Sequence, residues 1–225
     1  MKKLFIIGNW KSYKTVKETT VWFQELRNKN RELMIKNKEI ILCVPFIFLS
    51  LAKDLIEKYD LPIKLGSQNI SPFGEGKYTG EVNGKQIKEF ADYVIIGHSE
   101  RRNYFSENEV MISQKIEQAI SSQLIPILCV SEVKQLQNIK NNMQDIIIAY
   151  EPLFAIGSGT PDSPKNAEKI SGEIQKKMHN SIVIYGGSVT AQNVNGFTST
   201  PSISGVLPGG ASLNAQEFVN IIIHA

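Results

Sequence analysis

The chain of 225 residues shows no break in composition, which favours one domain over residues 1–225 with a sizeable buried core. Lys and Arg number 25 against 22 Asp and Glu, and because the basic residues are scattered, the net charge of +3 gives no reason to expect a nucleic-acid partner. No apolar run is long enough for a membrane span, and the stretch before Gly8 is too short for a secretory signal, so we expect a cytoplasmic protein without a membrane partner.

Short apolar runs rich in Ile and Val recur about eight times, followed by polar or Gly-containing residues and then by helical patterns. Apolar residues at consecutive rather than alternate positions indicate strands buried on both faces, as in a parallel sheet. Strands that alternate with helices predict βα units, and eight units predict closure into a (β/α)8 barrel of the α/β class. The predicted strands are 4–7, 40–44, 63–65, 93–96, 125–130, 146–150, 182–185 and 203–207, and the clearest predicted helices are 16–28, 48–59, 107–122 and 165–179.

An open, doubly wound sheet is the alternative architecture. It requires a glycine-rich first turn, but the turn at 8–11 (GNWK) contains a single glycine. The segment 157–160 (GSGT) lacks the third glycine of a dinucleotide-binding loop. The barrel is therefore the better prediction.

The fifth crossover is unusually short. Only residues 133–149 separate Glu132 from Tyr150, and the last of them belong to the predicted sixth strand. We expect a short helix at most in this crossover, and a barrel surface there that is either exposed or covered by an extra contact.

Residues typical of active sites follow several predicted strands. The C-terminal ends of barrel strands meet at one rim, where catalytic groups are assembled. An ammonium, an imidazole, a carboxylate and two glycine-containing turns are therefore predicted to converge. These residues are Asn9 and Lys11, His98, Glu151, Gly187 with Ser188, and Gly209 with Gly210.

Six motifs resemble those of the triosephosphate isomerase family, in the same order and at similar spacing: GNWK at 8–11, GHSERR at 97–102, YEP at 150–152, AIG at 155–157, YGGSV at 185–189 and GGASL at 209–213. The resemblance spans the chain and implies the TIM-barrel fold. It also implies that the protein interconverts dihydroxyacetone phosphate and D-glyceraldehyde 3-phosphate through an enediolate, with no cofactor and no metal. A different phosphate-binding barrel isomerase, or an inactive barrel that serves as an interaction protein, remains the alternative.

Glu151 is the predicted catalytic base. The neighbouring apolar residues Leu153, Phe154 and Ile156 are expected to desolvate its carboxylate, which would raise its pKa and strengthen it as a base. His98 stands before a predicted helix, whose N-terminus disfavours an imidazolium, so we expect a neutral ring that donates a hydrogen bond to a substrate oxygen.

Lys11 is expected to bring positive charge to the phosphate and to the developing enediolate. Asn9 can donate to the substrate carbonyl. By resemblance, Glu100 is the acidic partner of Lys11, and it also suits the first turn of a helix as an acid that counters the dipole.

The phosphate site is predicted from backbone geometry. The turns after strands seven and eight of a barrel commonly bind phosphate through their N–H groups, and glycine permits close approach. The segment 154–160 resembles the family's lid, which would exclude water. The predicted phosphate-binding residues are Gly157, Ser158, Gly187, Ser188, Gly209 and Gly210.

The chain departs from the family pattern at several positions. Phe154 stands where the family usually has tryptophan, and residues 160–162 (TPD) stand where it usually has Lys-Thr-Ala. Because Pro161 fixes its own φ and restricts Thr160, we predict altered lid opening with intact chemistry. Pro208 cannot donate a ladder hydrogen bond, so a gap in strand pairing is predicted there.

The segment 76–81 resembles the family's protruding third loop, which docks beside a partner's active site. This resemblance implies a homodimer formed through the loop around Thr79. The short fifth crossover resembles that of compact relatives that assemble further, so a tetramer is left open.

Overall fold

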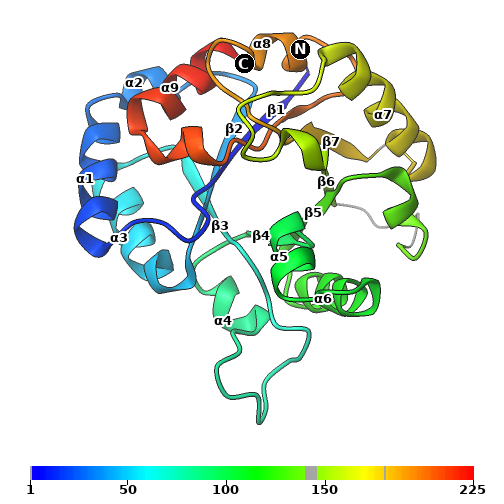
Figure 1. Cartoon of the computed structure of the whole chain (residues 1–225). Helices are drawn as coiled ribbons and strands as arrows, with labels where there is room; N and C mark the ends of the chain where they lie inside the picture. Colours follow the sequence, from blue (N-terminus) through cyan, green and yellow to red (C-terminus); the bar gives the residue numbers. More distant parts are fainter. Residues whose placement is uncertain (1, 140–145, 180) are drawn as a thin grey trace.

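A computed structural model describes residues 2–139, 146–179 and 181–225, and in this part of the chain eight parallel strands close into a barrel in chain order. Helices surround the strands (Figure 1). The predicted (β/α)8 fold is therefore confirmed. The strands are β1 Leu4–Asn9, β2 Lys38–Val44, β3 Ile63–Ser67, β4 Tyr93–Ile96, β5 Ile125–Val130, β6 Ile147–Tyr150, β7 Ile182–Tyr185 and β8 Gly205–Val206.

Two apolar clusters explain why the strands are apolar at consecutive positions. One cluster, which includes Ile95 and Cys129, consists of side chains from the strands and their ends and fills the barrel. The other includes Ile96 and Val130 together with residues from the surrounding helices. Successive side chains of a strand point to opposite faces, so both faces of each strand are covered.

Most of the longer helices begin at capping residues that the sequence provides. The side chain of Thr15 caps α1 in a capping box, Asn108 caps α6, and Ser163 caps α7 with a proline at the first position. No helix in the described residues is long and apolar enough to cross a membrane. The helices are α1 Val16–Arg27, α2 Asn30–Leu33, α3 Leu49–Tyr59, α4 Gly84–Lys88, α5 Ser99–Tyr104, α6 Glu109–Ser121, α7 Pro164–Lys177, α8 Val194–Thr198 and α9 Ala215–His224, and the short 3-10 helices are η1 Phe46–Phe48, η2 Val133–Leu136, η3 Leu153–Ala155 and η4 Gly210–Leu213.

Several predicted elements differ from the structure by one or two residues at an end, and two of these differences have a clear physical basis. The helix predicted at 107–122 begins only at Glu109, because Asn108 caps it, and Glu107 instead lies buried in an ion pair with Lys115. The strand predicted at 203–207 is regular only over Gly205–Val206, although Ser204 and Leu207 on either side donate backbone hydrogen bonds to β7. The backbone of Pro208 nevertheless accepts a hydrogen bond from the N–H of Asn9 at 2.9 Å, so the predicted gap in pairing is a short one.

The described part of the fifth crossover is short, as predicted. It contains the single turn η2, which packs against α7 and β5, and Leu136 and Ile139 are buried there. Residues 140–145 of this crossover lie outside the described residues.

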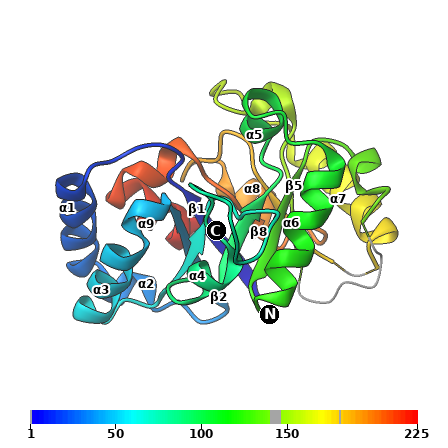
Figure 2. The ribbon, with the colours of Figure 1, turned by 90° about the horizontal axis from the view of Figure 1, so that it is seen from below.

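The barrel separates two ends of the molecule. Figure 2 shows α5 and the segment after β6 at one end and the N-terminus at the other. The loop between β3 and α4, residues 68–83, extends away from the barrel (Figure 1).

Candidate functional site

A cavity of about 250 Å³ lies at the C-terminal ends of the strands. The predicted polar side chains that reach it come from the ends of four strands, β1, β4, β6 and β7, because parallel strands in a closed barrel direct these ends to one rim. All the predicted site residues except Glu100 and Ser158 line the cavity, namely Asn9, Lys11, His98, Glu151, Gly157, Gly187, Ser188, Gly209 and Gly210.

Glu151 stands directly after β6 and is only 4% exposed. Its backbone N–H donates to the carbonyl of Val130 at 2.8 Å, which continues the pairing of β5 with β6. One carboxylate oxygen, Oε1, lies 3.6 Å from Nε2 of His98, and Oε2 has no hydrogen-bond partner among the described residues. Burial raises the pKa of Glu151, while His98, the Cys129 thiol and Lys11 act in the opposite direction. The carboxylate is therefore placed as a base should be.

The desolvation of Glu151 agrees only in part with the prediction. Ile156 is half-buried and lines the cavity together with Glu151, but Leu153 and Phe154 are 58% and 63% exposed and do not enclose the carboxylate. Gly186 on the neighbouring strand end does, because a Cβ at this position would lie 2.9 Å from Cγ of Glu151. Gly186 also lines the cavity and was missed as a site residue, although it is the first glycine of the YGGSV motif.

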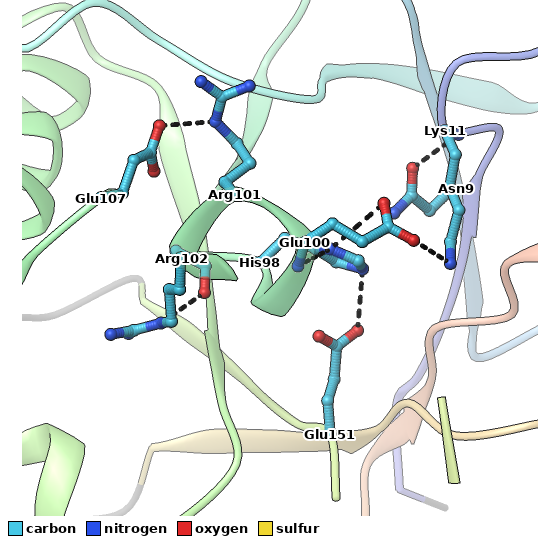
Figure 3. Close-up of polar contacts among 9 residues, drawn as sticks. Asn9, Lys11, His98, Glu100, Arg101, Arg102, Glu107 and Glu151 are labelled. Carbon is cyan, nitrogen blue, oxygen red and sulfur yellow. Dashed lines mark hydrogen bonds and ion pairs between the residues drawn. The ribbon is translucent and has the colours of Figure 1, made fainter. Parts of the chain in front are cut away.

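His98 is the N-cap residue of α5, and its Nδ1 accepts the N–H of Glu100 at 3.3 Å. An acceptor Nδ1 places the proton of a neutral ring on Nε2. This nitrogen faces Glu151 (Figure 3). A neutral ring can therefore donate to an oxygen held beside the carboxylate, and the substrate-binding role of His98 stays a prediction.

Lys11 has a left-handed backbone with φ of 51°, a conformation that costs roughly 1–3 kcal/mol and persists where the surroundings enforce it. Its Nζ donates to Oε1 of Glu100 at 2.6 Å, and its N–H donates to Oδ1 of Asn9 at 2.9 Å (Figure 3). The second bond leaves the amide N–H groups of Asn9 available to the cavity. A Cβ at Gly209 would lie 3.2 Å from Cε of Lys11, so this glycine makes room for the lysine.

Ser188 connects the predicted lid to the turn after β7. Its hydroxyl accepts the N–H of Gly159 at 3.1 Å and donates to the carbonyl of Ala155 at 2.7 Å. Ser158 does not line the cavity, because its hydroxyl bonds to the backbone of Thr160. Gly159, which was not predicted, lines it instead.

Asp162 anchors the second end of the predicted lid. Its backbone N–H donates to the hydroxyl of Tyr185 at 2.8 Å, and its carboxylate accepts the N–H of Ser163 and the side chain of Asn166, both at 2.7 Å. Tyr185 in turn stacks on Phe197 with ring centroids 4.0 Å apart. The departure from the family at this hinge therefore provides an anchor, and its effect on lid opening stays a prediction.

Within the described residues, no group of three or more His, Cys, Asp or Glu side chains is arranged to hold a metal ion. Cys43 and Cys129 are both buried and unpaired in the described structure.

Comparison with known proteins gives one consistent match. The family model described as triosephosphate isomerase matches residues 4–225. Relatives named triosephosphate isomerase from Dictyoglomus thermophilum and Mesomycoplasma hyopneumoniae (strain 232) are each 41% identical, over 99% and 100% of both chains respectively. A relative of the same name from Trichodesmium erythraeum is 37% identical over 99% of both chains. The similarity therefore extends over the whole length of these proteins rather than over a shared part.

Proposed function

The chain belongs to the triosephosphate isomerase family and interconverts dihydroxyacetone phosphate and D-glyceraldehyde 3-phosphate, and on this premise we propose that the cavity at the C-terminal strand ends is its active site. Gly187, Ser188, Gly209 and Gly210 hold the phosphate through backbone N–H groups, with Gly157 and Gly159 of the lid closing over it. Lys11 supplies the countercharge.

The reaction then proceeds by proton transfer between neighbouring carbons. The carboxylate of Glu151 removes a proton from C1 of dihydroxyacetone phosphate, and the electron pair of that C–H bond forms a C1–C2 double bond while the carbonyl oxygen takes up negative charge. His98 donates from Nε2 to this oxygen, and Asn9 and Lys11 stabilise the charge. Protonated Glu151 returns the proton to C2, which takes it up with the electron pair of the C1–C2 double bond. The C1 hydroxyl passes its proton, by way of Nε2 of His98, to the charged oxygen on C2, and its O–H electron pair forms the carbonyl of the aldehyde.

The observation that carries this proposal is the convergence of Lys11, His98 and Glu151, from three separate strand ends, on one cavity. A different phosphate-binding barrel explains the glycines but not this set. An inactive barrel has no need of a buried carboxylate with an oxygen that lacks a hydrogen-bond partner among the described residues, because such a group is costly to keep in a fold.

The test is Glu151→Gln in an isomerisation assay coupled to a dehydrogenase. The amide keeps the shape and removes the base, so turnover is expected to fall by about 10²–10⁴-fold. Glu173→Gln, on the exposed face of α7, is the matched control and is expected to keep the parent rate. Near-parent turnover of the Glu151 variant contradicts the mechanism, and a parent enzyme inactive on both triose phosphates favours the inactive barrel.

We also propose that the protein is a homodimer formed through the loop of residues 68–83, which carries Thr79. This loop projects from the barrel and is stiffened by Phe73 stacked on Tyr78 at 4.3 Å. The exposed side chains of Ile47 and Phe105, 81% and 63% accessible, offer apolar surface for a partner. Light scattering tests this proposal, with a monomer contradicting it and a tetramer extending it.

Two further proposals come from the sequence. Residues 1–225 form one domain, which predicts a single cooperative unfolding transition in calorimetry. The enzyme works in the cytoplasm, which suits its two unpaired thiols and is tested by cell fractionation.

A further inference from the structure

Arg102 on α5 makes hydrogen bonds to three groups that converge on its guanidinium. Nε donates to the carbonyl of Gly97 at 2.7 Å, Nη1 to Oε1 of Glu109 at 2.6 Å, and Nη2 to the carbonyl of Cys129 at 3.4 Å. The side chain is only 13% exposed. Two of the three partners are backbone groups at the ends of neighbouring strands.

The first of these backbone groups sets the position of His98. Gly97 precedes His98 and has a left-handed backbone with φ of 67°. A Cβ at Gly97 would lie 3.0 Å from Nη2 of Arg102, so the turn and the guanidinium fit closely together. Figure 3 shows Arg102 beside the same turn of α5 from which His98 extends toward Glu151 and Glu100 toward Lys11.

The second backbone group leads to the catalytic carboxylate. Cys129 lies in β5, and the next residue, Val130, accepts the backbone N–H of Glu151. Arg102 therefore connects two strand ends: the end of β4, which His98 follows, and the end of β5, where Val130 binds the backbone of Glu151. The side chains of His98 and Glu151 meet with Nε2 and Oε1 3.6 Å apart.

We infer that Arg102 is a positioning residue that holds the imidazole of His98 in register with the carboxylate of Glu151. The inference rests on the proposed roles of these two residues. A planar guanidinium presents its N–H donors in a fixed fork, and a lysine at this position can keep the ion pair with Glu109 but cannot reach both carbonyl groups at once.

The first experiment compares Arg102→Lys with the matched control Glu109→Gln, which removes only the negative charge of the partner that does not belong to a strand end. Small displacements of catalytic groups slow reactions strongly. We expect kcat of R102K to fall about 10- to 100-fold with KM changed less than about threefold, because the phosphate-binding turns lie on other strands. E109Q is expected to stay within about threefold of the parent in both constants.

The second experiment asks whether the loss passes through His98. In a His98→Asn background, adding R102K is expected to cost less than about threefold, because the group that it positions is already gone. The inference is overturned if the kcat losses of the two substitutions multiply in the double variant. It is also overturned if R102K keeps the parent kcat while H98N is slow. A parent-like H98N instead overturns the proposed role of His98.

Each rate is divided by the concentration of folded enzyme, which is measured by circular dichroism. Arg102→Gln is the second variant, and it should show the same fall in kcat. If neither Arg102 variant folds, the residue is structural and the inference is wrong.

Discussion

Replacement of Gly186 by alanine tests how the proposed active site fixes the position of Glu151, its proposed base. The added Cβ would lie 2.9 Å from Cγ and 3.0 Å from Oε1 of Glu151, closer than ordinary carbon contacts. Glu151 is 4% exposed, so its side chain has little room in which to retreat. Overpacking of this kind costs about 1–3 kcal/mol. If the carboxylate gives way and the whole cost falls on the transition state, turnover drops about 5- to 150-fold.

The assay is the dehydrogenase-coupled isomerisation, with thermal melting measured in parallel. Gly172→Ala on α7 is the matched control, because its Cβ would meet only Oγ of Ser202, at 3.7 Å, and alanine favours a helix by roughly 0.5–1 kcal/mol. We expect G172A to keep its rate and melt no earlier. A G186A enzyme that turns over within twofold of the parent, with unchanged stability, would refute the idea that this contact fixes the base.

Three further outcomes follow from the structure. Burial raises the pKa of Glu151, so the folded protein binds the carboxyl proton more tightly than the unfolded chain does. The contribution of this group to the free energy of unfolding therefore falls as the pH rises above about 4.3, the pKa of an unperturbed glutamate. In urea titrations, E151Q is expected to be more stable than the parent at pH 7, and the difference should vanish in acid. Burial also acts to raise the pKa of Glu39, but hydrogen bonds from two lysines and Tyr93 lower it to about 2. The stability that this carboxylate contributes is present above its unfolded pKa and is lost as the pH falls toward 2. The free energy of unfolding of E39Q should therefore decrease less than that of the parent over this pH range. Tyr185→Phe removes the hydroxyl that accepts the N–H of Asp162, a hydrogen bond that contributes about 1 kcal/mol. Because the predicted lid would be held less firmly, KM is expected to rise roughly fivefold. An unchanged KM contradicts the anchoring role.

Local patterns were sufficient for the barrel and for most of the site. Consecutive apolar residues mark strands covered on both sides, and polar residues just after them must reach one rim once the strands are parallel. His98 illustrates the point, because the helix start that follows it in sequence provides the N–H of Glu100 that its Nδ1 accepts in the structure.

Contacts between strands were not predictable in the same way. Leu153 and Phe154 are adjacent to Glu151 in sequence but face solvent, whereas Gly186, which encloses the carboxylate, is separated from it by a helix and a strand. Glu107 was expected in a helix, yet it lies before the start of α6 and forms a buried ion pair with Lys115.

The sequence by itself determined the order of strands and helices, the rim on which the polar residues gather and the chemical types of those residues, since each depends on the periodicity of neighbouring residues and on the family motifs. Only the tertiary structure decided which groups desolvate Glu151, which lid residue faces the cavity and how Arg102 joins two strand ends. The reason is physical: burial and hydrogen-bond partnership depend on atoms brought together by barrel closure, and residues far apart in the chain carry no local sign of that contact.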